Sequence, residues 1–381
     1  MKRTSSQYLQ REKGEDSFSL SQGDKVKRLF VSLFAFALLN SALKAEMFSL
    51  SLFQNMTDNV FQNMFLEKDQ LSSLNFYLDK DFSKISFFTE GNYVYLYENS
   101  GFSYYFHGMG LDYLYPVNEK SAFYFALIGQ GAFYRADFND FNYLSLNVLS
   151  SFKTYISPTS ILKSNYALEY KHYGYSLYDF ISHLLDVSFD SYFQTRTTIK
   201  AELNWGYKNY LNSLLPAEDS QSIQILAVKG LVAQGMGGRV GLNVSGTKQW
   251  TLSGENPFSS IEEFYMVENP SYDRYSWQGY QISSELTILV PWNIELKMGY
   301  TRSEKEFPGI ESMDLDGNPL GVIRKDTRAQ FEARVEKNFP KFSLFFSYIY
   351  IDNHSNDSFF NWQGNFLAVG LEWNVFFGGN E

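Results

Sequence analysis

The side chains best suited to acid–base chemistry near neutral pH are four histidines: His107, His172, His183 and His354. His183 lies close along the chain to Asp179 and Asp186, but no recognisable pattern of Ser, His and acid accompanies it. Because the members of a catalytic triad meet in space and not in sequence order, spacing alone does not reveal one. We interpret the histidines as rim or interior residues and predict no enzyme activity.

Two further motifs could in principle hold ligands. Asp314, Asp316 and Asn318 place oxygen ligands at alternate positions, as calcium loops do, but the later bidentate Glu is missing. An exposed Asp-Gly turn explains this segment without a metal. The glycines of segment 235–238 are followed by no helical pattern, so they indicate a turn and not a nucleotide site. We expect no metal and no cofactor.

The remaining charged residues recur at every second position of long stretches, alternating with apolar side chains. The positions that we predict to share one polar face are Lys200, Glu202, Glu285, Glu295, Lys297, Arg328, Glu332, Arg334 and Glu336, with Glu169, Lys171, Asp186, Asp190, Lys208 and Glu372 as further candidates. Among these positions, Arg328, Glu332, Arg334 and Glu336 are the residues that we expect first to line the interior. Charges of both signs on one face indicate a hydrated channel or an interior packed with ion pairs.

These charges must be positioned by β-strands, because side chains of a strand point to opposite faces in turn. The clearest case is Ile294, Leu296, Met298 and Tyr300, which alternate with polar residues or glycine. The same alternation runs through segments 198–208, 280–290 and 328–336. A helix would scatter these charges around its circumference. The sequence therefore predicts an all-β fold.

The links between the expected strands are short and long in turn. The short links lie near 80–83, 116–119, 157–160, 194–196, 236–238, 290–293 and 338–341. The longer links lie near 55–68, 135–140, 173–181, 209–221, 252–274, 303–325 and 353–364, and one link near 98–101 is short. Short turns on one side and longer loops on the other are typical of membrane β-barrels. With 47–53 as the first strand, we predict an antiparallel up-and-down transmembrane barrel of about 16 strands, with 14 or 12 as alternatives.

Composition favours the same fold. Aromatic residues make up 18% of the chain, with 36 Phe and 28 Tyr, yet no apolar run long enough for a membrane helix follows residue 45. Strands that need one apolar face, with aromatic girdles at both interfaces, produce this combination. The chain has no cysteine, which excludes disulfides and cysteine-bound metals.

The net charge argues against nucleic acid as a partner. Residues 1–45 hold eight Lys/Arg and four Asp/Glu, which leaves 24 basic and 38 acidic residues after position 45, a net −14. Binding of nucleic acid needs a basic surface to meet the phosphates.

The first 45 residues have the order of a secretory signal peptide. Lys25-Val26-Lys27-Arg28 precedes an apolar run over 29–39, and a polar stretch then ends at Ala45. This run is too short to span a membrane as a helix. We predict a leader and signal peptide over 1–45, cleaved after Ala45, and a single barrel domain over 46–381.

The last strand carries the most specific pattern. Leu367, Val369, Leu371, Trp373, Val375 and Phe377 alternate with smaller or polar residues around Gly370. This pattern resembles the terminal strand signal of Gram-negative outer-membrane proteins. The resemblance implies an outer-membrane location, contact with membrane lipid, and recognition by the barrel-assembly machinery through Gly370, Leu371, Trp373, Val375 and Phe377. In contrast to many family members, four residues follow Phe377.

A looser resemblance covers about residues 324–377. Arg324-Lys325-Asp326-Thr327-Arg328 leads into a strand, and Tyr348-Ile349-Tyr350 is followed by Asn353-His354-Ser355-Asn356-Asp357. These segments are similar to the closing repeats of barrels attached to tetratricopeptide helices, including the surface lipoprotein assembly modifiers. The resemblance implies a barrel, and a role in export is one alternative that it leaves open.

Two functions remain as hypotheses. The first is a porin-like channel for passive or selective diffusion of small polar solutes, because charges from many strands face inward. The second is a plugged barrel whose loops bind or adhere to a surface ligand, or assist export. Aromatic and acidic residues in the 252–274 link, such as Phe258, Glu262, Glu263, Phe264 and Tyr265, fit either an aromatic girdle or a surface site.

Overall fold

A computed structural model describes residues 47–212, 222–255 and 273–376. The chain divides into the units Met1–Ala45 and Glu46–Glu381. The expected signal peptide and Phe377 lie outside the described residues, as do Phe258, Glu262, Glu263, Phe264 and Tyr265. Within the described residues, no helix is both long and apolar enough to cross a membrane.

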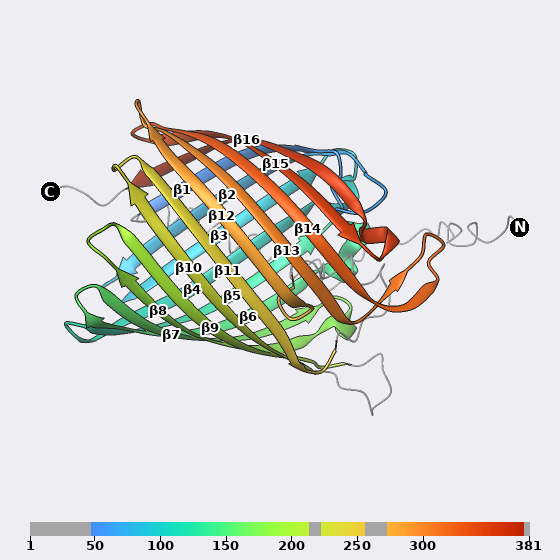
Figure 1. Ribbon diagram of the computed structural model, residues 1–381, viewed down its shortest axis with the longest axis horizontal. Coiled ribbons are helices and arrows are strands. Elements are labelled where there is room, and N and C mark those ends of the chain that lie inside the picture. Colours follow the sequence, from blue (N-terminus) through green and yellow to red (C-terminus); the bar gives the residue numbers. More distant parts are fainter. Residues whose placement is uncertain (1–46, 213–221, 256–272, 377–381) are drawn as a thin grey trace, which may run out of the picture. The chain divides into compact units, whose positions relative to one another are not determined.

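The second unit is a closed barrel of 16 antiparallel strands, in which each strand pairs with its sequence neighbours and β1 pairs with β16 (Figure 1). The strands are β1 Met47–Thr57, β2 Asp69–Phe82, β3 Ile85–Leu96, β4 Tyr104–Asn118, β5 Ser121–Tyr134, β6 Tyr143–Ser157, β7 Ser160–Tyr173, β8 Phe180–Tyr192, β9 Thr197–Tyr210, β10 Ser222–Met236, β11 Val240–Ser253, β12 Gln278–Val290, β13 Ile294–Met313, β14 Pro319–Asn338, β15 Phe342–Ser355 and β16 Trp362–Phe376. Four short 3-10 helices lie in the longer links: η1 Ser100–Phe102, η2 Ala136–Phe141, η3 Ser176–Tyr178 and η4 Ser358–Phe360. The predicted all-β barrel and its count of 16 strands are confirmed.

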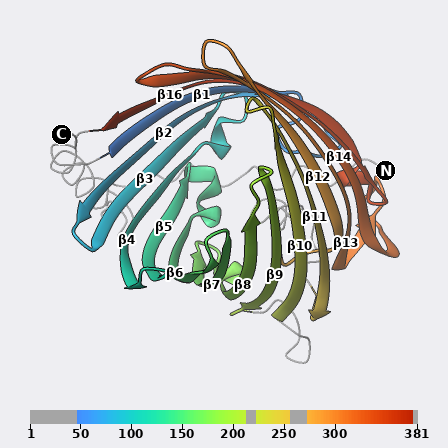
Figure 2. The same ribbon diagram turned by 60° about the vertical axis from the view of Figure 1, so that its left-hand side comes forward.

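All seven predicted short links are tight turns, and they lie at one end of the barrel, which we call the turn end. The longer links lie at the other end, the loop end (Figure 2). One prediction is wrong: residues 303–325 are not a loop, because β13 continues to Met313 and β14 begins at Pro319. The strands pair from Ser303↔Arg328 to Glu306↔Lys325 and beyond. The residues that pair at its base, 303–306 and 325–328, are all polar, so the alternation that marks a membrane strand is missing there.

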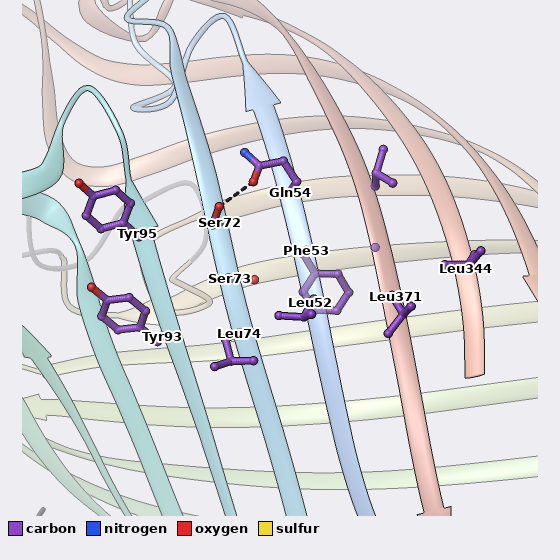
Figure 3. Close-up of a pocket in the computed structure, with 12 residues that line it drawn as sticks. Leu52, Phe53, Gln54, Ser72, Ser73, Leu74, Tyr93, Tyr95, Leu344 and Leu371 are labelled. Atoms are coloured by element: carbon purple, nitrogen blue, oxygen red, sulfur yellow. Dashed lines mark hydrogen bonds between the residues drawn. The ribbon is translucent and has the colours of Figure 1, made fainter. Parts of the chain in front are cut away.

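The strand register separates an apolar face from a polar face. Leu52, Leu74 and Tyr93 lie side by side on β1, β2 and β3, and each is 39–50% exposed. With leucines of β15 and β16 they line a shallow apolar depression (Figure 3). Large exposed apolar side chains continue in this way around the barrel. Such a surface is suited to lipid, so the alternate side chains form the inner face of the barrel.

The pairing of β1 with β16 is packed on its inner face by two phenylalanines and one glycine. The rings of Phe53 and Phe345 lie 5.4 Å apart between centroids, and both cover Gly370 of β16. A Cβ at this position would overlap both rings. Gly370 is therefore required by packing at the seam that closes the sheet.

We predict that Gly370→Ala lowers the free energy of unfolding by about 1–3 kcal/mol, because the added methyl group forces the two rings out of place. The temperature at which the folded band is lost on a semi-native gel measures this. Gly299→Ala is the control, because its Cβ would find its nearest neighbour at 3.7 Å on the same inner face. Equal losses in both variants would contradict this account of the seam.

Candidate functional site

The inner face of the barrel carries all nine of the charged residues singled out in the sequence. The register pairs Lys297 with Arg334 and Glu295 with Glu336 across β13 and β14, and Arg328 with Ser303. Glu285 and Glu332 both pair with Gly299, from β12 and β14. Three strands away from β12, Lys200 and Glu202 occupy successive inner positions of β9. The structure thus distributes these residues over two groups, one on β12–β14 and one on β9.

The first group is an ion-pair network near the turn end. Lys297 Nζ lies 2.6 Å from Glu295, and Arg334 lies 2.8 Å from Glu336 and 3.8 Å from Glu372 of β16. The guanidinium of Arg334 also lies 3.9 Å from the ring centroid of Phe345. The network therefore contacts the aromatic side chains that pack where β1 and β16 close the sheet.

The second group lies on β7–β9. Lys163 pairs with Asp190 at 2.6 Å, and Lys200 pairs with Glu202 at 2.7 Å. Amide side chains complete it: Asn165 donates to Asp186 at 2.6 Å and Asn204 donates to Glu202 at 3.1 Å. Opposite charges and amides on neighbouring strands stabilise a polar inner face in this way.

These pairs run along the wall and not across the lumen. In the described part of the chain, each ion pair between inner-face strand residues joins residues on the same strand or on strands at most two apart. The side chains of Lys200, Lys297 and Arg334 remain 28–40% exposed. A lumen packed solid with salt bridges would bury these groups, so the arrangement fits a hydrated interior.

Residues 273–277, which precede β12, fold inward along the wall, and we call them the strap. Asp273 of the strap lies 3.3 Å from the Nζ atom of Lys208 on β9. Tyr275 donates from its hydroxyl to the backbone carbonyl of His183 at 3.2 Å. Gly206 makes room for the ring of Tyr275, because a Cβ there would lie 2.8 Å from it. Part of the β11–β12 link therefore lies inside the barrel, at the loop end.

An aromatic cluster surrounds this contact. Its buried members are Tyr173, Tyr178, Phe180, Tyr210, Ile223, Ile225 and Tyr275. Lys208 is 1% exposed, and its ammonium lies 4.1 Å from the ring centroid of Phe180 and 4.8 Å from that of Tyr210. Burial of Tyr275 raises the pKa of its phenol. An ammonium in such surroundings needs its carboxylate partner, because a lone buried charge is costly.

A second buried cluster holds the loop end of β13–β15. Arg324 is fully buried, forms an ion pair with Asp326, and lies over the rings of Phe307 and Phe360. Asp326 also accepts a hydrogen bond from Ser355 Oγ at 2.7 Å. The two segments that resemble closing barrel repeats, 324–328 and 353–357, thus contact each other directly.

Asp357 closes this second cluster from the η4 link. It accepts hydrogen bonds from the backbone N–H groups of Met313 at 3.1 Å and Phe359 at 2.9 Å. Burial raises the pKa of its carboxyl group, although these hydrogen bonds and Arg324 oppose that effect. Its role is to hold the tip of β13 against η4.

All four histidines lie on the outer face of the barrel. Three of them lie towards the rim, and His107 differs from our interpretation of the histidines as rim or interior residues. His107 is buried in the wall itself, on the side of Phe76 and Tyr105. The other three lie towards the loop end, where His172 contacts Asp179 at 2.7 Å, His183 contacts Tyr166 at 2.8 Å and His354 contacts Asp352 at 3.3 Å. None of these three forms a hydrogen bond to a serine hydroxyl within the described residues. The register partners of His107 are Gly91 and Gly131, and the space above them is filled by Phe76 and by Leu144 and Phe133.

The remaining sequence motifs are turns and strand positions. Asp314 uses its carboxylate to accept hydrogen bonds from Asp316 and Asn318 in the β13–β14 tip, and its pKa is lowered chiefly by Asn318. Its oxygens therefore serve the turn, and no cluster of three metal-ligating residues exists in the described chain. Segment 235–238 forms the β10–β11 turn.

The five residues of the expected assembly signal divide between the two faces. Gly370 faces inward, while Leu371, Trp373 and Val375 lie on the apolar outer face, and Phe377 lies beyond the described residues. Their recognition by an assembly machinery stays a prediction.

No protein-family model and no curated protein matches this chain. Among solved structures, the chain is similar to CdiB from Acinetobacter baumannii, with 8% identity and a TM-score of 0.52, over 86% of this chain and 60% of that one. It is also similar to OpdO of Pseudomonas aeruginosa, at 7% identity and a TM-score of 0.46, over 87% and 97% of the two chains. For OccAB1 of Acinetobacter baumannii the values are 8%, 0.48, 87% and 96%. These likenesses concern the barrel fold.

We predict that Asp273→Asn lowers the free energy of unfolding by about 3 kcal/mol, because it removes a carboxylate from contact with the buried ammonium of Lys208. Urea unfolding of the folded protein in detergent measures this loss. Glu304→Gln is the control, since it breaks a 3.8 Å pair with Arg302 in which both side chains are about half exposed. That change should cost less than about 1 kcal/mol. Similar losses in both variants would show that the strap contact is not a buried one.

Proposed function

We propose that this protein is a porin-like channel of the Gram-negative outer membrane, through which small polar solutes diffuse. The observation that carries the proposal is the two groups of paired charges on the inside of a closed 16-strand barrel, one on β7–β9 and one on β13–β16. A barrel of this strand number is wide enough for water to pass between opposite walls. Charged side chains that form ion pairs with neighbours along the wall keep the passage polar, and they do not extend across it.

In this proposal the turn end faces the periplasm and the loop end faces outward, as in other barrels with short turns and longer loops. Residues 1–45 would direct export and be removed, and the terminal strand would then be read by the barrel-assembly machinery. The strap and the two buried clusters lie at the loop end, so they narrow the outer mouth.

The charge around the lumen is uneven, which supports selective passage. The described inner positions of β1–β5 carry carboxylates and no Lys or Arg; towards the turn end and mid-wall these are Asp79, Asp81, Glu90 and Asp112. The inner positions of β6–β10 carry six lysines and four carboxylates: Lys153, Lys163, Lys171, Lys200, Lys208 and Lys229, with Glu169, Asp186, Asp190 and Glu202. A solute in the lumen therefore lies between an acidic wall and a lysine-rich wall, and its charge affects its passage.

A second candidate function, binding or adhesion at the surface, is favoured by the β13–β14 hairpin. Its strands are 20 residues long, against 11–15 for the others, so the hairpin extends past the rest of the wall. This extension and the channel are compatible, because the hairpin lies at the rim.

Reconstitution of pure, folded protein in a planar lipid bilayer tests the channel. The protein is first shown to be folded by its faster migration on a semi-native gel before heating. We expect steady, stepwise conductance. Folded barrels that give no conductance at all would overturn the channel proposal and leave the surface-binding candidate.

We further predict that the double variant Asp81→Asn, Asp112→Asn shifts selectivity towards anions. Asp81 of β2 and Asp112 of β4 both pair with Ser86 of β3, so the two carboxylates lie in one row on the inner face. Their neutralisation removes negative potential from the acidic wall. The reversal potential in a salt gradient measures the shift. Glu304→Gln, on the outer face, should leave the reversal potential unchanged; an equal shift there would contradict a local effect inside the lumen.

A further inference from the structure

Four inner-face side chains at the loop end of β4–β7 form what we call the tyrosine–lysine patch: Tyr104, Tyr134, Tyr143 and Lys171. Tyr104 and Tyr134 are direct partners in the β4–β5 register. Tyr143 pairs with Ala132, two residues from Tyr134, and Lys171 pairs with Ser145, two residues from Tyr143. Four adjacent strands, which Figure 2 shows side by side, thus place these groups together.

The geometry of the patch is compact. The ring centroids of Tyr104 and Tyr134 lie 5.3 Å apart, and the Nζ atom of Lys171 lies 4.1 Å from the ring centroid of Tyr143. The Tyr143 hydroxyl interacts electrostatically with those of Tyr134 and Tyr104. All four side chains are half-buried, in contrast to the fully buried Lys208 nearby. Lumen water therefore reaches them.

The ammonium of Lys171 contacts aromatic rings, at 4.1, 5.1 and 5.8 Å from the centroids of Tyr143, Tyr173 and Phe180. Across the described residues, the hydroxyls of Tyr104, Tyr134 and Tyr143 have no hydrogen-bond partner, and Lys171 has no carboxylate within ion-pair distance. The inner lysines at positions 163, 200, 208 and 297 have such a carboxylate, whereas Lys153 and Lys229, like Lys171, form no ion pair with a described residue. Polar groups that converge without mutual bonds are arranged for a ligand.

The chemistry of these groups selects a class of solute. An ammonium ion binds an anion, and three phenol hydroxyls, each a donor and an acceptor, suit a molecule with several hydroxyl groups. Glu169 lies two residues from Lys171 on the same face, and its negative charge reaches Tyr143. This charge disfavours a phosphate dianion and leaves a singly charged carboxylate as the better partner for Lys171.

We propose that the tyrosine–lysine patch is a binding subsite for hydroxylated carboxylates, such as sugar acids, at the mouth of the lumen. This inference rests on the proposed channel function and names the solute class that the channel prefers. Lys171 holds the carboxylate, and the three tyrosine hydroxyls bind the hydroxyl groups of the solute.

The test is a saturation-transfer NMR titration of the full chain, expressed with its own leader and extracted from membranes in detergent. Three probes separate the groups: gluconate, propionate as a carboxylate without hydroxyls, and glucose as a polyol without charge. Lys171→Met should weaken gluconate and propionate binding about tenfold, the loss expected for one charge-assisted contact, and leave glucose unchanged. Tyr143→Phe keeps the ring under Lys171 and should weaken gluconate and glucose a few-fold, but not propionate.

Lys153→Met is the matched control, because the ammonium of Lys153 also lies over a tyrosine ring, 4.9 Å from the centroid of Tyr155, but at the turn end. It should bind gluconate as the parent protein does. An equal loss in Lys153→Met would show a general effect of lumen charge and overturn the subsite. Unchanged gluconate binding in Lys171→Met, or in Lys171→Gln if the first variant does not fold, would overturn it as well.

Binding measured in this way does not depend on an open channel. Gluconate binding that is sensitive to Lys171, in folded barrels without conductance, would keep the subsite and reject the channel. Conductance without gluconate binding would keep the channel and reject the subsite.

Discussion

Closure of the sheet between β1 and β16 is the constraint on which the rest of the structure depends. In hydrocarbon, every backbone N–H and C=O group must find a partner in the protein, so a strand edge facing lipid is not tolerated. The first and last strands of the barrel meet this demand by pairing from Met47↔Phe376 to Thr57↔Phe366. Once the circle is closed, the two-residue period of each strand sends alternate side chains to lipid and to the lumen. Gly370 and its two phenylalanine rings lie at the point where this closure is made.

The charged side chains of the inner face must also be stabilised. Charged side chains that point into a barrel are partly removed from water and need partners nearby. Here the partners come from the same or neighbouring strands, as in Lys200–Glu202 and Arg334–Glu336. Among the described residues, full burial of a cationic side chain occurs at the loop end, where aromatic rings enclose Lys208 and Arg324. The barrel is thus most tightly packed at its mouth and more polar below it.

Much of this arrangement could be predicted from the sequence, because period-two alternation is a local property. It placed strands at 280–290, 294–301 and 328–336, and it assigned Lys297, Arg334 and Glu336 to one face. The turns were predictable for the same reason: each lies where alternation stops for a few residues, which are mostly polar residues, prolines or glycines.

Other features depend on contacts that no local pattern contains. The strap reaches Lys208 from a residue 65 positions away, and the only trace in the sequence is a glycine, Gly206, opposite Tyr275. The tyrosine–lysine patch needs the register of four strands before Tyr104 and Lys171 become neighbours. The extension of β13 and β14 was hidden because, outside the lipid, a strand no longer needs one apolar face.

That extension carries a turn past the rest of the barrel wall. Asp314 holds the β13–β14 tip together by accepting hydrogen bonds from Asp316 and Asn318. The pairing of the two strands below the tip shifts register between Glu306 and Met313, and Asp357 of the η4 link binds Met313 there. With the loop end outward, as proposed, a foreign peptide inserted at this tip would be displayed at the end of a two-stranded stem, which makes the hairpin an attachment point for labelling at the cell surface.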